Sequence, residues 1–478
     1  MAEITEFESY DGLGLAELVR TKAVTADELL DAAIARAGRI NPSINAIVTE
    51  MYDHARSAIA AGLPQGAFTG VPFLLKDLRA FVAGVPCSYG SRFFADFVPD
   101  HNSEIVNRYL RAGLVIFGRT NTPELGSSVS TEPLLHGPTR NPWNPDLIAG
   151  GSSGGAAAAV ASRLAPMAHG SDGGGSIRIP AACCGVFGLK PTRGRNPVGP
   201  DYGESWSGLS AEHVLTRSVR DSAAMLDETS GPDVGDPYWA PPQPESYLAA
   251  VGQPPGRLRI AVSTEAASGA AIDPDCVSAT EAAARLCEEL GHDVVEAAPE
   301  YDSAGVGEPY RVIIASNVMA SIQDRSIALG REPGPEDLET VIAILARIGL
   351  THTAADYARA LQKLHRESRS VARFYQQYDM FLTPTLATPP PPLGSFSTMT
   401  DDVDAYLSRL FGFIPFTALS NITGQPAMSM PLSWNDDGIP IGVHFTAGFG
   451  QEAALFRLAS QLEEAKPWAH RIPEFAKV

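Results

Sequence analysis

Between residues 148 and 180 the chain reads IAGGSSGGAAAAVASRLAPMAHGSDGGGSIRIP, and this segment constrains the fold more than any other. Two clusters of glycine and serine, 150–155 and 171–176, flank an alanine-rich stretch and a short apolar run. Glycine adopts backbone conformations that other residues avoid, so each cluster predicts a tight turn. The stretch at about 155–162 predicts a compact helix, and the run at about 165–169 predicts a strand. The segment is therefore expected to be a packed unit and not a flexible loop.

The rest of the chain alternates short apolar runs with longer amphipathic stretches. Strands are predicted at Val71–Leu75, Leu114–Phe117, Leu258–Val262, Val294–Val295, Ala427–Leu432 and Ile441–Phe445. Helices are predicted from about Ala26, around Val277–Leu290, through most of 305–370 and at Glu452–Glu464. Thr25 and Glu28 have the spacing of a capping box before the first helix, and Asn41-Pro42 is expected to end it. This rhythm predicts a parallel or mixed sheet covered by helices.

Length and composition narrow the class of protein further. The chain has 478 residues, of which 44% are hydrophobic and 19% are charged. This composition excludes a disordered chain, a coiled coil and a collagen-like fibre. The length is compatible with one large α/β domain or with two smaller domains. No stretch approaches the roughly 18 uninterrupted apolar residues of a membrane helix, so no membrane association is expected.

Charge and cysteine usage indicate partners and compartment. Lysine and arginine number 36 against 55 acidic residues, a net charge of −19, and no basic patch is visible, so nucleic-acid binding is not expected. Five cysteines, an odd number without a CxxC pair, predict free thiols in a reducing compartment. The first residues, MAEITEFESYDG, lack the apolar core of a secretory signal, and a cytoplasmic location is expected. The histidines show no metal-ligand spacing, so no metal site is expected.

The glycine clusters can also carry chemistry. Successive backbone N–H groups in such a turn can converge on one point and bind an anion. The oxyanion that develops when an amide or ester carbonyl is attacked needs donors of this kind. Ser176 ends the second cluster, where its hydroxyl would lie beside the atom that becomes the oxyanion.

These clusters allow two other interpretations. Gly151–Gly155 matches the G-x-S-x-G pattern, which would make Ser153 a nucleophile with a histidine base. His213, His444 and His470 follow in the chain, but none has a distinctive context. The dinucleotide-binding fingerprint and the Walker A loop are both missing from the sequence, so nucleotide binding is weakly supported.

A lysine can replace histidine as the base, provided that burial lowers its pKa enough to leave it neutral. Lys76 follows the apolar run Val71–Leu75, which is an environment of that kind. The alternative is a lysine that reaches solvent or pairs with Asp77, and position alone does not decide between them.

Seven stretches form a long, ordered set along the chain: Gly70–Asp77, Gly118–Glu124, Asn141–Asn144, Gly150–Gly155, Asp172–Arg178, Cys184–Thr192 and Asn421–Ala427. In these stretches the chain resembles the amidase signature family of Ser–Ser–Lys hydrolases, and the resemblance covers nearly the whole chain. From Thr131 to Arg195 it is most similar to the branch that contains 6-aminohexanoate cyclic-dimer hydrolase and aryl acylamidases.

The resemblance implies a role for each matching residue. Ser176 matches the acylated nucleophile, Ser152 the bridging serine that follows a cis peptide bond, and Lys76 the lysine that relays protons through it. The N–H groups of Gly173, Gly174, Gly175 and Ser176 match the oxyanion hole. Ser153, Asp172 and Arg178 match the supporting residues. The chain has Ser-Asp-Gly-Gly-Gly-Ser where the family often has Thr-Asp-Thr/Ile-Gly-Gly-Ser, and the extra glycine removes no donor.

The resemblance also implies a fold and a function. It implies a single α/β domain over 1–478 with a central mixed sheet and helices on both faces. The family-like core is expected at about 66–230 and 370–478, with a variable, substrate-recognising region at about 231–370. The expected activity is hydrolysis of a small-molecule substrate, either an acyl or aryl amide or a linear or cyclic oligoamide, without cofactor or metal. The sequence leaves a homodimer open.

Two alternatives to a free-standing amidase stay open on the sequence. One is the amidase subunit of a glutamine-dependent tRNA amidotransferase, which shares the motifs but typically has glutamine where this chain has Ile179. The other is a catalytically inactive binding protein, which the presence of Lys76, Ser152 and Ser176 disfavours.

Overall fold

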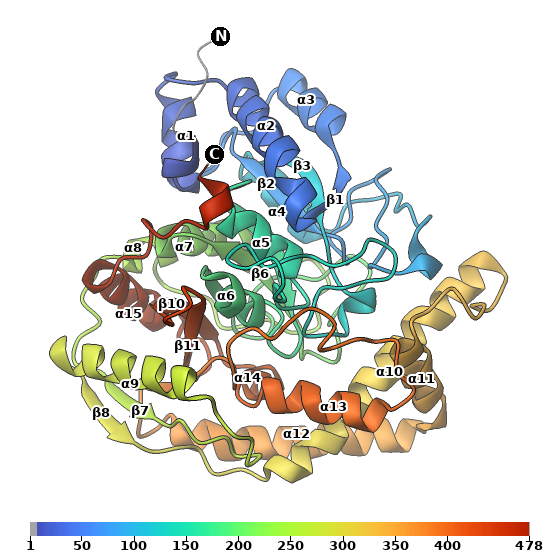
Figure 1. Cartoon of the computed structure of the whole chain (residues 1–478), viewed down its shortest axis with the longest axis vertical. Helices are drawn as coiled ribbons and strands as arrows, with labels where there is room; N and C mark the ends of the chain where they lie inside the picture. Colours follow the sequence, from blue (N-terminus) through green and yellow to red (C-terminus); the bar gives the residue numbers. More distant parts are fainter. Residues whose placement is uncertain (1–6, 478) are drawn as a thin grey trace.

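The computed structural model describes residues 7–477, and the first six residues, on which the expectation about a secretory signal partly rests, lie outside the described residues. One sheet of eleven strands runs through the molecule in the order β1-β3-β2-β4-β6-β5-β10-β11-β9-β7-β8 (Figure 1). Its strands are β1 (Ile47–Glu50), β2 (Pro72–Lys76), β3 (Val115–Thr120), β4 (Met167–Asp172), β5 (Phe187–Lys190), β6 (Ala211–Thr216), β7 (Arg259–Val262), β8 (Asp293–Glu296), β9 (Met380–Pro384), β10 (Ala427–Trp434) and β11 (Pro440–Ala447).

The sheet is mixed. β2 runs parallel to β3 and β4, and β7 runs parallel to β8 and β9. The other pairs are antiparallel, including β4 with β6, β5 with β6 and β10, and β11 with β9 and β10. A single mixed sheet with helices packed on it confirms the predicted fold class.

Fifteen α-helices lie within residues 7–477. They are α1 (Gly12–Arg20), α2 (Ala26–Ile44), α3 (Tyr52–Ala61), α4 (Glu104–Arg111), α5 (Gly154–Ala161), α6 (Arg178–Cys184), α7 (Val219–Thr229), α8 (Tyr247–Ala250), α9 (Pro274–Glu289), α10 (Ser303–Leu329), α11 (Thr340–Thr351), α12 (Ala354–Phe374), α13 (Val403–Phe413), α14 (Thr417–Thr423) and α15 (Glu452–Ala465). None of them is both long enough and apolar enough to cross a membrane.

Helices cover both faces of the sheet, as the alternation along β10 and β11 demonstrates. A Cβ atom on Gly442 would lie 2.5 Å from the Cβ of Ala182, so α6 packs on the face to which position 442 points. The neighbouring Val443 points the other way, into an apolar cluster with Met428 and with Phe456 of α15. The two helices therefore lie on opposite faces.

The predicted elements are present, but one predicted boundary is wrong. Thr25 and Glu28 form the predicted capping box at the start of α2, whereas the helix does not end at Asn41-Pro42 and continues to Ile44. Ile44 is fully buried, and Asn41 Oδ1 accepts hydrogen bonds from the N–H groups of Ala46 and of Ile47, the first residue of β1. Burial of the last turn outweighs the hydrogen bond that proline cannot donate.

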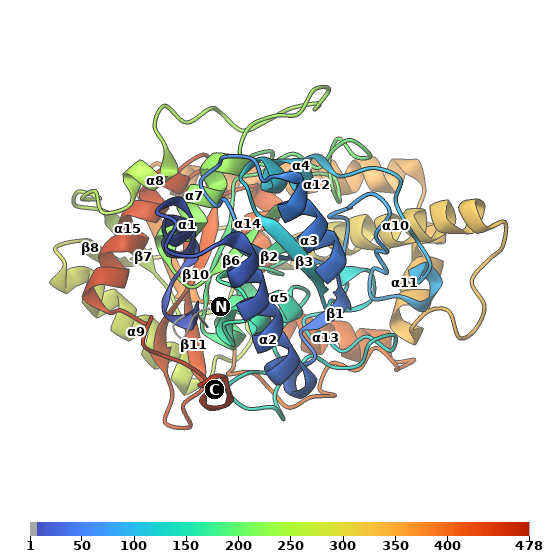
Figure 2. The ribbon, with the colours of Figure 1, turned by 90° about the horizontal axis from the view of Figure 1, so that it is seen from above.

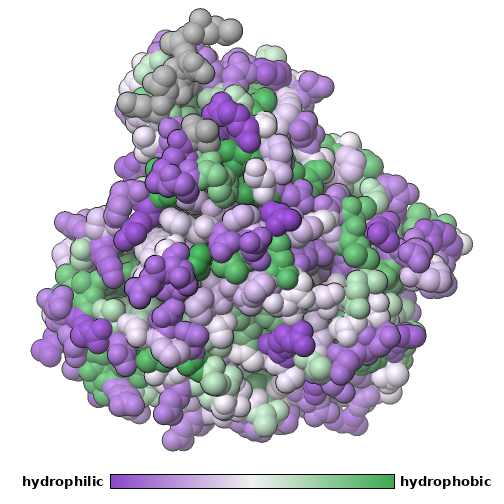
Figure 3. Space-filling view, in the orientation of Figure 1, coloured by the Kyte–Doolittle hydropathy of each residue, from purple (hydrophilic) through white to green (hydrophobic). Residues whose placement is uncertain are grey.

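Three helices, α10 to α12, form most of the predicted helical region 305–370, and α10 and α11 project from one side of the molecule (Figure 2). α10 packs against both α11 and α12. The space-filling view shows small apolar patches between hydrophilic side chains on the face of Figure 1 (Figure 3). The proposed division into a family-like core and a variable region stays a prediction.

Candidate active site

The lysine at the end of β2 is fully buried. Lys76 Nζ donates hydrogen bonds to Ser152 Oγ at 2.7 Å and to Ser171 Oγ at 2.9 Å. Burial lowers the pKa of Lys76 to about 7, although the nearby carboxylates of Glu212 and Asp172 act to raise it. A lysine with this pKa is largely neutral just above neutral pH, and a neutral amine has a lone pair that accepts a proton.

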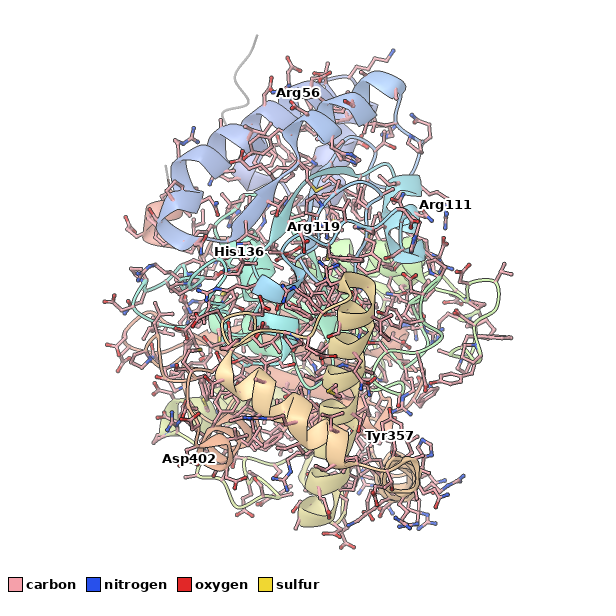
Figure 4. All side chains as sticks on the ribbon, turned by 90° about the vertical axis from the view of Figure 1, so that its right-hand side faces the viewer. Arg56, Arg111, Arg119, His136, Tyr357 and Asp402 are labelled. Atoms are coloured by element: carbon pink, nitrogen blue, oxygen red, sulfur yellow. The ribbon has the colours of Figure 1, made fainter. Side chains whose placement is uncertain are left out.

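The alternative that Lys76 pairs with Asp77 is not what the structure shows. The Asp77 carboxylate accepts hydrogen bonds from the backbone N–H and the hydroxyl of Ser88, and it lies 4.0 Å from Arg119 Nε. The pKa of Asp77 is lowered: burial acts against this, but the His136 ring, 3.9 Å from the carboxylate, and the charge of Arg119 outweigh it. Figure 4 labels Arg119 and His136 in a view from the side of the molecule on which α10 and α11 lie nearest to the viewer.

The first glycine cluster forms the turn before α5. The peptide bond between Gly151 and Ser152 is cis, as the resemblance implies. The carbonyl of Ser152 accepts a hydrogen bond from Thr122 Oγ1 at 3.0 Å. Ser153 Oγ donates to the carbonyl of Ser171 at 3.3 Å and accepts from the N–H of Ser171 at 3.4 Å, which ties this turn to the second cluster.

Every carbonyl from Asp172 to Gly175 is held by a donor elsewhere in the protein. The donors are Asn421 Nδ2 to Asp172, Tyr310 OH to Gly173, Thr417 Oγ1 to Gly174 and the Ile179 N–H to Gly175, at 2.7 to 2.8 Å. Because a trans peptide is planar, each held carbonyl turns the next N–H the opposite way. The orientation of the predicted donors is thus fixed by residues from α10, α14 and α6 and not by the loop alone.

Of the four N–H groups predicted to bind the oxyanion, that of Gly175 is already engaged in another hydrogen bond. The N–H of Gly175 already donates to Asp172 Oδ1 at 2.8 Å. The N–H groups of Gly173, Gly174 and Ser176 donate to no acceptor in the described part of the chain. Gly175 has another role, since its φ is +132° and a Cβ there would lie 2.5 Å from Thr417 Oγ1, so only glycine fits.

Asp172 and Arg178 form a buried ion pair below this loop. Arg178 Nε donates to Asp172 Oδ2 at 2.9 Å and its second amino group donates to Oδ1 at 2.8 Å. Burial acts to raise the pKa of Asp172, but the charge and hydrogen bonds of Arg178 hold it below its ordinary value. Arg178 also donates to Asn421 Oδ1 at 2.7 Å, which connects the pair to α14.

The G-x-S-x-G alternative has no histidine to support it. His213 contacts Ser222, and burial lowers its pKa to about 3. Arg178 donates to His444 Nε2, and burial holds the pKa of His444 well below its ordinary value. His470 is exposed near the carboxyl end. Ser153 Oγ forms hydrogen bonds only with the backbone of Ser171 among residues 7–477, and the supporting role of Ser153 stays a prediction.

Residues that sequence reasoning missed complete the site. Ser171 contacts Lys76, and the only sequence signal for it was its place in the second cluster. Tyr310 and Thr417 lie far from the loop in sequence. Tyr310 lies outside the seven matching stretches, and Thr417 lies shortly before the last of them, Asn421–Ala427. No group of three or more histidine, cysteine or acidic side chains in the described chain is arranged to hold a metal ion.

Ser176 is partly buried at the meeting point of two hollows. Ser152 lines one of these with it, but no hydrogen bond joins the two hydroxyls within the part of the chain that the structure describes. The geometry thus brings Lys76 and Ser152 into contact and places Ser176 in the same hollow as Ser152.

A family model described as Amidase matches residues 28–456. The chain belongs to the amidase family. This amidase is 38% identical to 6-aminohexanoate-cyclic-dimer hydrolase of Paenarthrobacter ureafaciens, over 97% of this chain and 96% of the relative. A solved structure of 6-aminohexanoate cyclic dimer hydrolase complexed with substrate has a TM-score of 0.93 at 36% identity, covering 98% of this chain and 99% of that one.

A bacterial aryl acylamidase has a TM-score of 0.87 at 27% identity, covering 98% of each chain. A subunit of the glutamyl-tRNA(Gln) amidotransferase from Thermotoga maritima has a TM-score of 0.77 at 26% identity, covering 97% of this amidase and 96% of that chain. The similarity therefore favours an enzyme that hydrolyses amide bonds over an amidotransferase component.

Proposed function

We propose that this amidase cleaves its substrate through Lys76, Ser152 and Ser176, with an acyl-enzyme on Ser176. The observation that carries the proposal is the buried contact of 2.7 Å between Lys76 Nζ and Ser152 Oγ, at a lysine whose pKa is lowered to about 7. A neutral Lys76 can donate to Ser171 and accept the proton of Ser152. Ser152 can then accept the proton of Ser176, whose oxygen attacks the amide carbonyl.

The donors for the oxyanion are the free N–H groups of Gly173, Gly174 and Ser176. They are fixed by the carbonyl contacts of the loop, so no reorganisation is needed when the charge develops. As the C–N bond breaks, Ser152 passes the proton to the leaving amine and recovers one from Lys76. Water then releases the acyl group by the same route. Catalytic hydrogen bonds are often long without substrate, and the bond between Ser152 and Ser176 forms when substrate binds.

The substrate class of the related hydrolase, a cyclic oligoamide, suggests that this amidase acts on a hydrophobic acyl amide or on a linear or cyclic oligoamide. The alternative is the amidase subunit of a tRNA amidotransferase. Ile179 supports the hydrolase, since its buried apolar side chain stands where that subunit typically has glutamine. Glutaminase activity of the purified protein would favour the alternative.

Labelling with a fluorophosphonate probe tests the nucleophile. Wild type and Ser153→Ala are expected to be labelled, and Ser176→Ala is expected to lose both labelling and turnover. Mass spectrometry of the labelled peptide locates the adduct. Labelling that survives in Ser176→Ala and disappears in Ser153→Ala would contradict the proposal.

A further inference from the structure

Two hollows of different chemistry meet at the predicted nucleophile. The polar hollow, about 520 Å³ including space open to solvent, is the richer of the two in polar side chains: Ser152, Ser171, Arg79, Ser205, Asn317 and Ser321 line it. Apolar side chains, among them Leu78, Leu125 and Val318, complete its wall. The apolar hollow, about 630 Å³ measured in the same way, is lined chiefly by Ile314, Leu345, Leu407, Leu410, Phe411 and Ile414. Gly126, Ser176 and Trp206 line both hollows and form the neck between them.

The position of Ser152 indicates which part of the substrate each hollow binds. Ser152 and Ser171, the two hydroxyls bonded to Lys76, line the polar hollow and not the apolar one. Under the proposed function, on which this inference rests, Ser152 delivers the proton to the leaving amine. The amine part of the substrate must therefore enter the polar hollow, which leaves the apolar hollow for the acyl part.

The apolar hollow is suited to an extended alkyl or aryl arm. Its walls come from α10, α11 and α13 through Ile314, Leu345 and Leu410. Each methylene removed from water contributes roughly 0.8 kcal/mol, which corresponds to about a fourfold gain in affinity. Arg311 also lines this hollow, but its side chain is exposed and lies at the solvent side.

The polar hollow contains a cation with unused donors. Arg79 is half-buried, donates to the neutral Ser205 Oγ at 2.5 Å and stacks over the Tyr202 ring at 4.6 Å. No carboxylate of residues 7–477 lies within ion-pair distance of it; Glu212, which also lines the hollow, is hydrogen-bonded to His169 at 2.6 Å. A guanidinium has five N–H donors in a fork that matches a carboxylate.

We propose that the preferred substrate is a linear N-acyl amino acid, with its apolar acyl arm in the apolar hollow and the carboxylate of its amine part bound by Arg79. The reaction forms a bond between Ser176 Oγ and the acyl carbon, breaks the C–N bond and releases a free amino acid whose amine takes the proton from Ser152. Water then attacks the acyl carbon, the bond to Ser176 Oγ breaks, and the carboxylic acid leaves as Ser176 regains its proton.

Matched amide pairs test the amine side. Hexanoyl amides of ω-amino acids with two to six carbons are compared with hexanoyl amides of the n-alkylamines of the same length, by kcat/KM from released amine. Wild type is expected to favour the carboxylate by at least about tenfold at the best length, the contribution of a charge-assisted hydrogen bond. Arg79→Gln is expected to abolish the preference and Arg79→Lys to keep part of it.

Arg311→Gln is the control for this experiment, because it removes an arginine from the other hollow. Its carboxylate preference is expected to equal that of wild type. A preference that persists in Arg79→Gln or disappears in Arg311→Gln overturns the proposal. Wild-type enzyme that favours the neutral amines also overturns it.

A second series tests the acyl side with acetyl to decanoyl amides of one fixed amino acid. Wild type is expected to gain about three- to fourfold per methylene until the apolar hollow is full. Ile314→Trp narrows this hollow and is expected to move the optimum to shorter acyl chains. Ile348→Trp, at an exposed position of α11, is the matched control and is expected to leave the optimum unchanged. An optimum that Ile314→Trp leaves in place overturns the proposal.

The labelling experiment separates the two proposals. An enzyme that is acylated at Ser176 but shows neither preference retains the proposed function and loses this inference. An enzyme that is not acylated at Ser176 loses both.

Discussion

Lys76 stands at the end of a strand whose five residues are all buried, and this position accounts for its suitability as a base. An exposed lysine is almost fully protonated at neutral pH, since its pKa is near 10.4. Burial lowers that of Lys76 to about 7. The hydroxyls of Ser152 and Ser171 accept hydrogen bonds from the buried amine, but they carry no negative charge that would favour its protonated form. The amine therefore remains available to accept a proton.

Loss of the Lys76 amine is expected to affect amides more than activated esters. Lys76→Ala should reduce kcat/KM for an anilide by about 10²- to 10⁴-fold, the usual contribution of general acid–base catalysis. A nitrophenyl ester should lose less, because a phenolate leaves without a proton. Lys76→Arg should not restore amide turnover, since arginine stays protonated. Equal small losses on both substrates, or rescue by arginine, would show that Lys76 is structural.

The pH dependence follows from the same group. Under the proposed mechanism the neutral form of Lys76 is the base, so kcat/KM for an amide should rise with pH through about 7 and then level off. Below that pH the rate should fall about tenfold per unit. A profile from pH 5 to 9 checks this, with circular dichroism at each pH as the control for folding. A rate that still rises steeply above pH 9 would contradict a lowered lysine pKa.

Tyr310 is expected to act as a positioning residue. Its hydroxyl donates to the carbonyl of Gly173 at 2.8 Å and so turns the N–H of Gly174. Tyr310→Phe keeps the ring, which lines the apolar hollow, and should lower kcat about tenfold with little change in KM. Tyr301→Phe, a tyrosine half-buried nearby, is the control. A raised KM with unchanged kcat would mean that Tyr310 only contacts substrate.

At the scale of elements, a pair of buried glutamates joins the neck of the hollows to α11. Glu124 precedes the neck residue Gly126, and its carboxylate accepts from the N–H of Glu339, the residue before α11, at 2.7 Å. Burial, reinforced by the charge of Glu339, raises the pKa of Glu124 to about 8. Between about pH 4.5 and pH 8, the Glu124 carboxyl is therefore protonated in the folded protein, whereas the carboxyl of an exposed glutamate is ionised.

The glutamate pair predicts a stability that falls as pH rises. The folded state holds the Glu124 proton up to about pH 8, whereas the unfolded chain releases it near pH 4.5, so the contribution is complete below pH 4.5 and is lost towards pH 8. Glu124→Gln should raise the melting temperature at pH 8.5 by about 2–4 °C and change it little at pH 5. Glu289→Gln, at an exposed position, is the control. Equal shifts at both pH values would contradict this assignment.

The elements also show which features the sequence could predict. A strand end and two glycine clusters mark the positions of Lys76, Ser152 and Ser176 in the sequence, but the roles of Lys76 and Ser152 were predicted only through the resemblance to the amidase signature family. β6 was not predicted, because Glu212 and His213 interrupt its apolar pattern, and both are buried by tertiary contacts, Glu212 with His169 of β4 and His213 with Ser222 of α7. The contacts of Tyr310 and Thr417 were likewise hidden, since tertiary packing alone brings them to the loop.

On the scale of the whole molecule, all five cysteines are buried, with at most 3% of any of them exposed. Burial raises the pKa of Cys87, Cys276 and Cys287 to about 12, so the reactive thiolate is scarce at neutral pH. Iodoacetamide is therefore expected to leave the activity of the native enzyme nearly unchanged over an hour. Alkylation after denaturation, counted by mass spectrometry, is the control. Rapid inactivation with one equivalent incorporated would contradict this prediction.

The order of strands in the sheet has a consequence for biosynthesis. β5, at 187–190, pairs with β10, at 427–434. The helix α14, at 417–423, is hydrogen-bonded to Asp172, Gly174 and Arg178. A chain emerging from the ribosome must therefore wait for more than 200 further residues before its reactive loop is held in place. Until then β5 has an unpaired edge, and such edges invite aggregation. The nascent amidase is thus inactive and most in need of a chaperone through the second half of its synthesis.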